Sequence, residues 1–174
     1  MGGIGYRNLK DHSIGVSVSD RLMELPAPEG VLIEDASYNP IALVQRLETG
    51  PVDRLVLVAA VNRGRAPGAI GYYRWDGKLP SAERIQGAVA EAVTGVIALD
   101  NTLMVGRHFG AFPEDVVVVE VEPVLEEFGD EFSIEVSSRF ESLCRLVMTL
   151  ATAPVGFDPP PIAPLGGGEA VRMA

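Results

Sequence analysis

The sequence predicts an α/β domain with three layers, in which helices cover both faces of a mixed, mostly parallel sheet. Two nearly continuous apolar runs, residues 54–61 and residues 115–121, are typical of strands that are buried on both faces of a parallel sheet. Segments with apolar residues at helical spacing alternate with these runs along the chain. Such alternation of strands and helices is typical of the α/β class.

The first third of the chain predicts two helices and a short strand. Residues 14–25 carry apolar residues at helical spacing, and Ser13 is a candidate N-cap for that helix. Residues 31–33 form a short apolar run that fits a strand. Asn39 can cap a second helix over residues 40–48, because a proline is well suited to the first helical position.

The middle of the chain predicts one strand and two more helices. Residues 69–75 fit a strand that is antiparallel to its neighbour and nearer an edge of the sheet. Residues 81–93 predict a helix with three apolar residues on its inner face, namely Ile85, Val89 and Val93. Residues 100–109 predict a further helix, with Asp100 as its cap and Gly110 after its end.

The last third predicts a long helix and then a change of composition. Ser133 can cap a helix that runs to about residue 151, with Val136, Phe140, Leu143 and Val147 on its inner stripe. From Pro154 onward the proline and glycine runs are not expected to form regular structure. We therefore expect one domain over residues 1–153 and a flexible tail over residues 154–174.

Composition and charge narrow the classes of function. The chain has 174 residues, of which 47% are hydrophobic and 22% charged, as is ordinary for a globular domain. The net charge of −10 argues against nucleic acid or an anionic membrane surface as partner. The single cysteine, Cys144, allows no internal disulfide, and no apolar run is long enough to span a membrane. These features favour a cytoplasmic protein without membrane insertion.

The opening stretch, residues 3–16, is the most informative part of the sequence. A Gly-x-Gly turn that leads into a helix lets the backbone approach a ligand closely. The stretch resembles the opening motif of the hydrogenase maturation endopeptidases, which trim the C-terminus of the large subunit of nickel–iron hydrogenases. The residues in register with that motif are Gly3, Gly5, Asp11, Gly15 and Val16.

The resemblance continues over about residues 3–150. Asp35 stands where the family has an aspartate, and residues 54–61 resemble the family's central strand. Residues 110–113 resemble its Gly-x-x-Pro loop, and residues 132–136 resemble the opening of its last helix. The resemblance implies the family's α/β fold and a nickel–iron hydrogenase large subunit, or its precursor, as partner. It also implies nickel or another divalent metal, which the substrate could supply. Because the family has a short strand before its first Gly-x-Gly, we expect residues 1–5 to be extended against residues 55–61, and the true start could lie upstream.

The family's metal site is changed in this chain. Family members carry a carboxylate in the opening loop, an aspartate at the end of the central strand and a histidine before the next helix. Here His12 replaces the loop carboxylate, Ala59 replaces the strand aspartate, and residues 91–95 contain no histidine. The resemblance therefore implies an altered or degenerate metal site.

Four residues are the candidate metal ligands. His12 stands at the start of a helix, where the helix dipole disfavours the imidazolium and leaves a neutral ring able to bind a metal. Asp11 could orient that ring or cap the helix, and Asp35 could be a ligand or a turn former. Glu91 could replace the missing histidine or lie on a solvated helix face. We expect His12, Asp11 and Asp35 to converge beside Ala59 in a polar cleft.

Other candidates have simpler interpretations. Arg63 and Arg65 follow the central strand and could grip an acidic peptide, or could be solvated. His108 near a helix end and Cys144 on an apolar stripe are interpreted as structural.

Three functions stay open at this point. The protein could bind the large subunit, or act on it, with a degenerate metal site. It could be an active metal-dependent endopeptidase that removes the large subunit's C-terminal peptide. It could instead be a small-ligand or phosphate-binding domain that uses residues 3–15.

Overall fold

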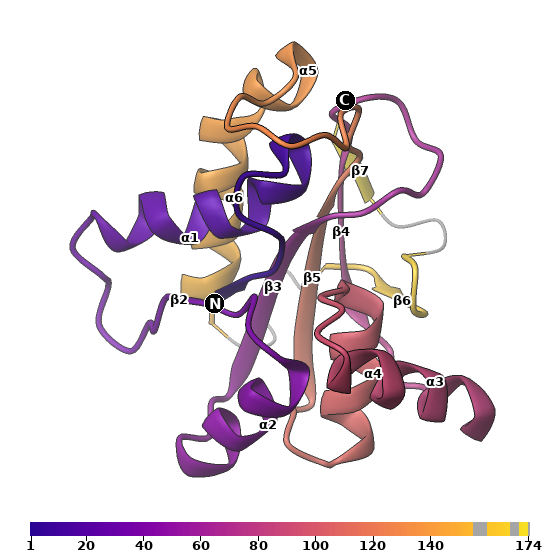
Figure 1. Ribbon diagram of the computed structural model, residues 1–174. Helices are drawn as coiled ribbons and strands as arrows, with labels where there is room; N and C mark the ends of the chain where they lie inside the picture. Colours follow the sequence, from indigo (N-terminus) through magenta and orange to yellow (C-terminus); the bar gives the residue numbers. More distant parts are fainter. Residues whose placement is uncertain (155–159, 168–170, 174) are drawn as a thin grey trace.

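The computed structural model describes residues 1–154, 160–167 and 171–173, which form a twisted sheet with helices on both faces (Figure 1). The strands are β1 (Gly2–Gly3), β2 (Glu34–Asp35), β3 (Arg54–Ala60), β4 (Ile70–Trp75), β5 (Asp115–Val121), β6 (Ile162–Ala163) and β7 (Val171–Met173). Their order in the sheet is β2-β1-β3-β5-β4-β6, and β7 also pairs with β4. The neighbours from β2 to β5 are parallel, whereas β4 is antiparallel to β5. The sheet is therefore mixed and mostly parallel, as the sequence predicts.

The two faces of the sheet bury different sets of helices. The helices are α1 (Ile14–Met23), α2 (Pro40–Thr49), α3 (Ala82–Val93), α4 (Leu99–His108), α5 (Ile134–Ser137) and α6 (Phe140–Thr152), with a 3₁₀ helix η1 (Lys10–Ser13) before α1. Val56 and Val58 of β3 pack with α1 and α6, whereas Leu55 and Leu57 pack with α2 and α4. Alternate residues of a strand point to opposite faces, which explains why both runs are apolar at almost every position.

The short strand β1 confirms the expectation for the N-terminal residues. Gly2 and Gly3 pair with Leu57 and Val58 of β3, and the Ile4 N–H donates to the Val58 carbonyl at 2.8 Å. The sequence predicts the neighbouring strand over residues 31–33, but β2 forms at Glu34–Asp35 instead. Its position is set by pairing with β1 and not by apolar composition. Leu32 of the predicted strand is 47% exposed.

The glycines of the opening stretch bring β1 and α1 into close contact. A Cβ atom on Gly15 would collide with the backbone carbonyls of Ile4 and Val58, and one on Gly3 would collide with the Gly15 carbonyl. These glycines therefore serve packing between a strand and a helix. That role leaves no observation that favours the phosphate-binding reading of residues 3–15.

We expect Gly15→Ala to destabilise the protein by about 1–3 kcal/mol or more, because the added methyl group meets backbone that cannot move aside cheaply. Urea unfolding of both proteins measures this loss. Gly87→Ala is the matched control, since a Cβ there meets no atom within 4 Å and alanine favours the helix. A stability of Gly15→Ala equal to that of the wild type would contradict the packing role.

Two helices differ in detail from the prediction. On α3 the buried residues are Ala88 and Ala92, whereas Val93 is 73% exposed, because the small alanines let α3 approach α4 closely. The predicted long final helix is broken into α5 and α6 around Ser138, whose hydroxyl donates to the Glu135 carbonyl. A serine that bonds to nearby backbone competes with regular helical bonding.

The expectation that the proline- and glycine-rich tail forms no regular structure is wrong for β6 and β7. The Arg74 N–H donates to the Pro161 carbonyl, and the Asp76 N–H donates to the Ala163 carbonyl. The open edge of β4 supplies the backbone groups for this pairing. Residues 155–159, 168–170 and 174 lie outside the described residues, and the domain boundary at 153 stays a prediction.

Candidate functional site

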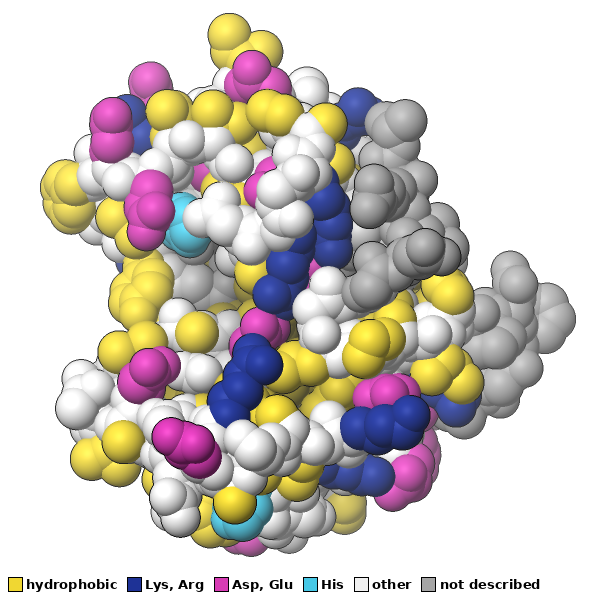
Figure 2. Space-filling view, turned by 90° about the vertical axis from the view of Figure 1, so that its right-hand side faces the viewer, with side chains coloured by type: hydrophobic (Ala, Val, Ile, Leu, Met, Phe, Trp, Pro, Cys, Tyr) yellow, Lys and Arg dark blue, Asp and Glu magenta, His cyan; other side chains and the backbone are white. Residues whose placement is uncertain are grey.

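A cavity of about 280 Å³ lies at the carboxyl ends of β1 and β3, where ligand sites of α/β sheets gather. Its lining comes from the loop after β1, from η1, from the end of β3, from the start of α4, and from Glu126. His12 and Ala59 both line it, together with Asn62 and Asp100. Figure 2 shows basic and acidic side chains meeting in a hollow between the upper and lower parts of one face.

His12 is the sequence-predicted residue that this cavity contains. Its Nε2 atom is buried and has no hydrogen-bond partner among the described residues. Its main chain is fixed in η1, since the His12 N–H donates to the Leu9 carbonyl and the His12 carbonyl accepts from the Tyr6 N–H. An unpaired buried nitrogen costs free energy, so a hydrogen-bonding or ligand group that reached this atom would be stabilising.

Asp11 does not share the cavity with His12. Its side chain is fully buried and accepts three backbone hydrogen bonds, from the N–H groups of Val124, Leu125 and Ser133 at 2.8–2.9 Å. Burial by itself would raise the pKa of Asp11, but these donors outweigh it and hold the pKa below the ordinary value. Asp11 therefore ties the loop after β5 to η1, rather than holding the His12 ring or capping α1.

Asp35 and Glu91 also lie away from His12. Asp35 accepts hydrogen bonds from the Ser37 N–H and from Arg7, and with Arg7 it lines a separate groove of about 410 Å³. Burial raises the pKa of Asp35, and the Ser37 and Arg7 donors more than reverse this. The exposed Glu91 accepts from the Asn101 amide at 2.6 Å. The predicted convergence of His12, Asp11 and Asp35 beside Ala59 is thus not observed.

Arg63 and Arg65 are held by carboxylates of the chain itself. Arg63 makes a bidentate pair with Asp100 at 2.6 and 3.0 Å and contacts Glu120 at 2.8 Å. Arg65 pairs with the other Glu120 oxygen at 2.5 Å. An acidic peptide would have to displace these carboxylates, and neither arginine is simply solvated. The prediction that Asp100 caps α4 is wrong, because its carboxylate is committed to Arg63 and α4 has no side-chain cap.

Glu120 is the residue that the sequence analysis missed. It is fully buried in β5, where it accepts from Arg63, Arg65 and the Tyr73 hydroxyl. Burial raises the pKa of Tyr73, and the charge of Glu120 adds to this effect. Its signal in the sequence is a single acidic residue inside a run of valines. A buried charge is rare unless it is paired, so that position predicts basic partners.

The structural interpretation of the remaining candidates is consistent with their environment. Cys144 is buried on the inner side of α6, and burial raises the pKa of its thiol to about 11, which disfavours the reactive thiolate. His108 is exposed at the end of α4, with its ring edge-on to Phe109 at 5.3 Å.

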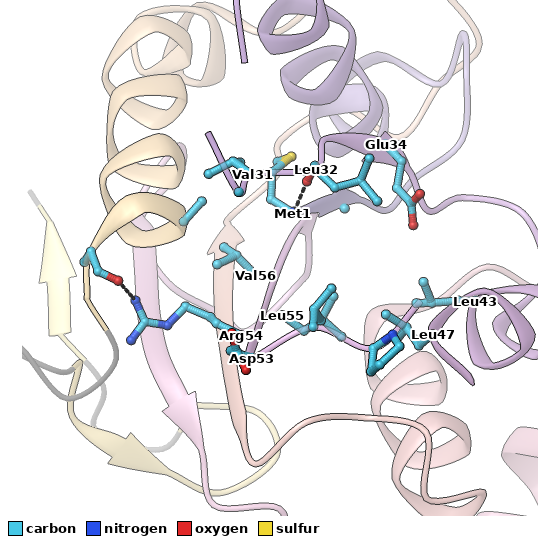
Figure 3. A pocket seen from close by; sticks show the side chains of 16 residues that line it. Met1, Val31, Leu32, Glu34, Leu43, Leu47, Asp53, Arg54, Leu55 and Val56 are labelled. Atoms are coloured by element: carbon cyan, nitrogen blue, oxygen red, sulfur yellow. Dashed lines mark hydrogen bonds between the residues drawn. The ribbon is translucent and has the colours of Figure 1, made fainter. Parts of the chain in front are cut away.

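A second cavity, of about 320 Å³, lies at the opposite, amino end of β3 (Figure 3). Its two cationic groups, Arg54 and the Met1 ammonium, already have partners. Arg54 pairs with Asp115 at 2.7 Å and donates to the carbonyls of Leu150 and Ala153. The Met1 ammonium donates to the Leu32 carbonyl, and burial lowers its pKa. The cavity at the carboxyl ends therefore remains the better candidate for chemistry.

The fold is that of an α/β protein with a ligand-type cavity at the carboxyl ends of its parallel strands. Solved structures similar to this chain include hydrogenase maturation proteases. HycI from Thermococcus kodakarensis KOD1 matches with a TM-score of 0.60 and 22% identity, covering 87% of this chain and 90% of that one. HybD from E. coli matches with a TM-score of 0.61 and 23% identity, covering 84% and 86%. An endopeptidase from Escherichia coli gives a TM-score of 0.62 and 24% identity, covering 84% and 86%.

These likenesses confirm the fold that the opening motif implied. No family model and no curated protein matches the sequence. No helix among the described residues is long and apolar enough to cross a membrane.

The residues present do not fit a metal held by this chain alone. Ala59 offers no ligand atom, and Asp100 is paired with Arg63. Within residues 1–154, 160–167 and 171–173, no group of three His, Cys, Asp or Glu side chains is arranged to hold a metal ion. His12 is left as a single nitrogen donor in the cavity.

Proposed function

We propose that this protein recognises the large subunit of a nickel–iron hydrogenase, or its precursor, during maturation, without a metal site of its own. The fold shared with hydrogenase maturation proteases supports the partner. The observation that carries the altered role is the cavity where Ala59 stands beside an unpaired His12 nitrogen. We place this activity in the cytoplasm, since a single buried cysteine suits a reducing compartment.

In this role, His12 contacts the nickel that the substrate carries. A neutral imidazole nitrogen is a suitable donor for nickel. With one protein donor in the cavity, the nickel would be held mainly by the large subunit. Contact with His12 would then favour binding of the nickel-loaded large subunit over the nickel-free form. Ala59 and the neighbouring apolar wall provide space rather than ligands.

The test is incubation with nickel-loaded large-subunit precursor, followed by intact mass spectrometry and a parallel pull-down. We expect the precursor to bind and to keep its C-terminal peptide. Removal of that peptide would support the alternative, an active endopeptidase, and would show that Ala59 is no obstacle to cleavage. Failure to bind would reject the proposed function.

We expect His12→Ala to remove the preference for nickel-loaded over nickel-free precursor. The wild type should bind the loaded form about tenfold more tightly, which corresponds to one added ligand contact of about 1.4 kcal/mol. Binding of both precursor forms to both proteins measures this preference. His108→Ala is the control. Because the exposed His108 lies outside the cavity, this variant should keep the preference for nickel-loaded precursor. An unchanged preference in His12→Ala would remove His12 from the site.

A further inference from the structure

The loop between β5 and α5, together with the first residue of α5, exposes large apolar side chains. Phe128 is 83% exposed, Ile134 is 85% exposed and Val124 is 46% exposed. Single apolar side chains on a surface are ordinary, but several on one short segment commonly mark a binding surface. These three residues with the acidic residues between them are named the loop patch below.

The loop patch is held in place by buried contacts. One carboxylate, that of Asp11, accepts from Val124 and Leu125 at one end of the loop and from Ser133 at the other. The two ends of residues 124–133 therefore lie next to each other, as in a closed surface loop. At the tip, the Gly129 N–H donates to the Asn8 carbonyl and its carbonyl accepts from the Lys10 N–H.

Because the loop is anchored in this way, the backbone of the folded protein holds Phe128 and Ile134 in exposed positions. The backbone on either side of them is fixed by hydrogen bonds to η1 and to the segment before it. A surface whose backbone is already ordered loses less conformational entropy when a partner binds. The patch is thus preorganised for binding.

The negative charge of the loop patch favours a partner segment that carries basic residues. Residues 124–134 contain no Lys, Arg or His, and they contain four exposed acidic residues, which are Glu126, Glu127, Asp130 and Glu131. Lys10 pairs with Glu127 at 2.8 Å, which leaves the patch strongly acidic. In Figure 2, hydrophobic and acidic side chains lie side by side across the top of the molecule, where Figure 1 places α5.

We propose that the loop patch docks a basic segment of the hydrogenase large subunit that carries an apolar anchor. This inference rests on the proposed function and names the surface used for recognition. The patch is continuous with the candidate site, since Glu126 belongs to the loop and also lines the cavity with His12. Docking on the patch would bring the neighbouring part of the partner to that cavity.

The experiment measures binding of nickel-loaded large-subunit precursor to the wild type, to Phe128→Ser/Ile134→Ser and to Asp130→Asn/Glu131→Gln. The first double variant should raise Kd at least about tenfold, as expected for apolar anchors. Raising the salt from roughly 50 to 300 mM should weaken wild-type binding, and the second double variant should reduce this salt dependence. Val93→Ser is the matched control, an exposed apolar residue on α3, and should bind as the wild type does.

The outcomes separate the two proposals. If the wild type does not bind the precursor, both proposals fail. If the wild type binds and Phe128→Ser/Ile134→Ser binds equally well, the docking surface is wrong and the proposed function stands. Light scattering tests whether a second copy of this chain binds the patch instead. If the wild type is a dimer and Phe128→Ser/Ile134→Ser is a monomer, the patch is a self-association surface and the docking proposal is wrong. Circular dichroism checks that each variant is folded.

Discussion

Replacing Asp11 by alanine is expected to lower the free energy of unfolding by about 3–6 kcal/mol. The substitution leaves the N–H groups of Val124, Leu125 and Ser133 without their acceptor. An unpaired buried donor costs about 1–3 kcal/mol, and the total stays below three times the upper value because the bonds to Val124 and Leu125 are only partly buried. Because domains of this size are stable by about 5–15 kcal/mol, the variant should be close to unfolding. Urea unfolding measures the loss.

Two further variants make the Asp11 prediction specific. Asp11→Asn keeps the shape but has a single acceptor oxygen, so it should lose less stability than alanine. Asp130→Ala removes an exposed carboxylate of the same loop and should stay within about 0.5 kcal/mol of the wild type. If Asp11 served only as a metal ligand, Asp11→Ala would match the wild type in metal-free buffer, and our interpretation would fail.

The stability contributed by Asp11 should also depend on pH. Its pKa in the folded state is depressed below the unfolded value of about 3.9. A carboxylate with a depressed pKa stabilises the fold fully above its unfolded pKa, and this contribution is lost as the pH falls through its folded value. The difference in stability between the wild type and Asp11→Asn should therefore be constant above pH about 5 and shrink in acid. A difference that is unchanged in acid would argue against an ionised Asp11.

The sequence predicts the sheet better than the site for a physical reason. Residues 54–61 and residues 115–121 are apolar at every position but one or two, because both faces of the central strands are covered. That pattern is local and can be seen without the rest of the chain. The two-residue strand β2 and the C-terminal strands β6 and β7 depend on pairing with distant backbone, which leaves little trace in composition.

The placement of His12 near Ala59 could be predicted, because the family resemblance places His12 in the loop after the first strand and Ala59 at the end of the central strand, and these two strands are neighbours in the sheet. The place of Asp11 could not, although it is adjacent to His12 in sequence. Its partners, Val124 and Ser133, are more than a hundred residues away and donate through backbone N–H groups. Any residue other than proline supplies such a donor, so nothing in the sequence marks those positions.

The pairing of Arg63 and Arg65 was missed for a related reason. Loop arginines after a strand usually point to solvent, and the sequence analysis weighed only solvent or a bound peptide. The acidic side chain that changes this is Glu120, which the parallel pairing of β3 with β5 places opposite Ala59. A valine run with one glutamate is the clue that could have joined these residues.

Replacing Glu120 by leucine is expected to destabilise the protein by about 3–5 kcal/mol, since it leaves the buried Arg65 guanidinium uncompensated and takes one of two carboxylates from Arg63. Arg63 retains Asp100, so most of the cost should come from Arg65, whose side chain is 7% exposed and has no second carboxylate in the described residues. Thermal unfolding or urea unfolding measures the effect.

The double variant Glu120→Leu/Arg65→Leu tests whether the cost is electrostatic. It removes both charges of the more buried pair, so it should recover part of the stability lost in Glu120→Leu, and the double-mutant cycle should show a coupling well above 0.5 kcal/mol. Losses that simply add would mean that Glu120 acts through packing alone.

A coupled pair would also matter for the site, because Arg63 joins Glu120 to Asp100, and Asp100 lines the cavity with His12. Glu120→Leu should then weaken binding of the precursor even under conditions where the variant is fully folded, whereas the double variant should restore it in part.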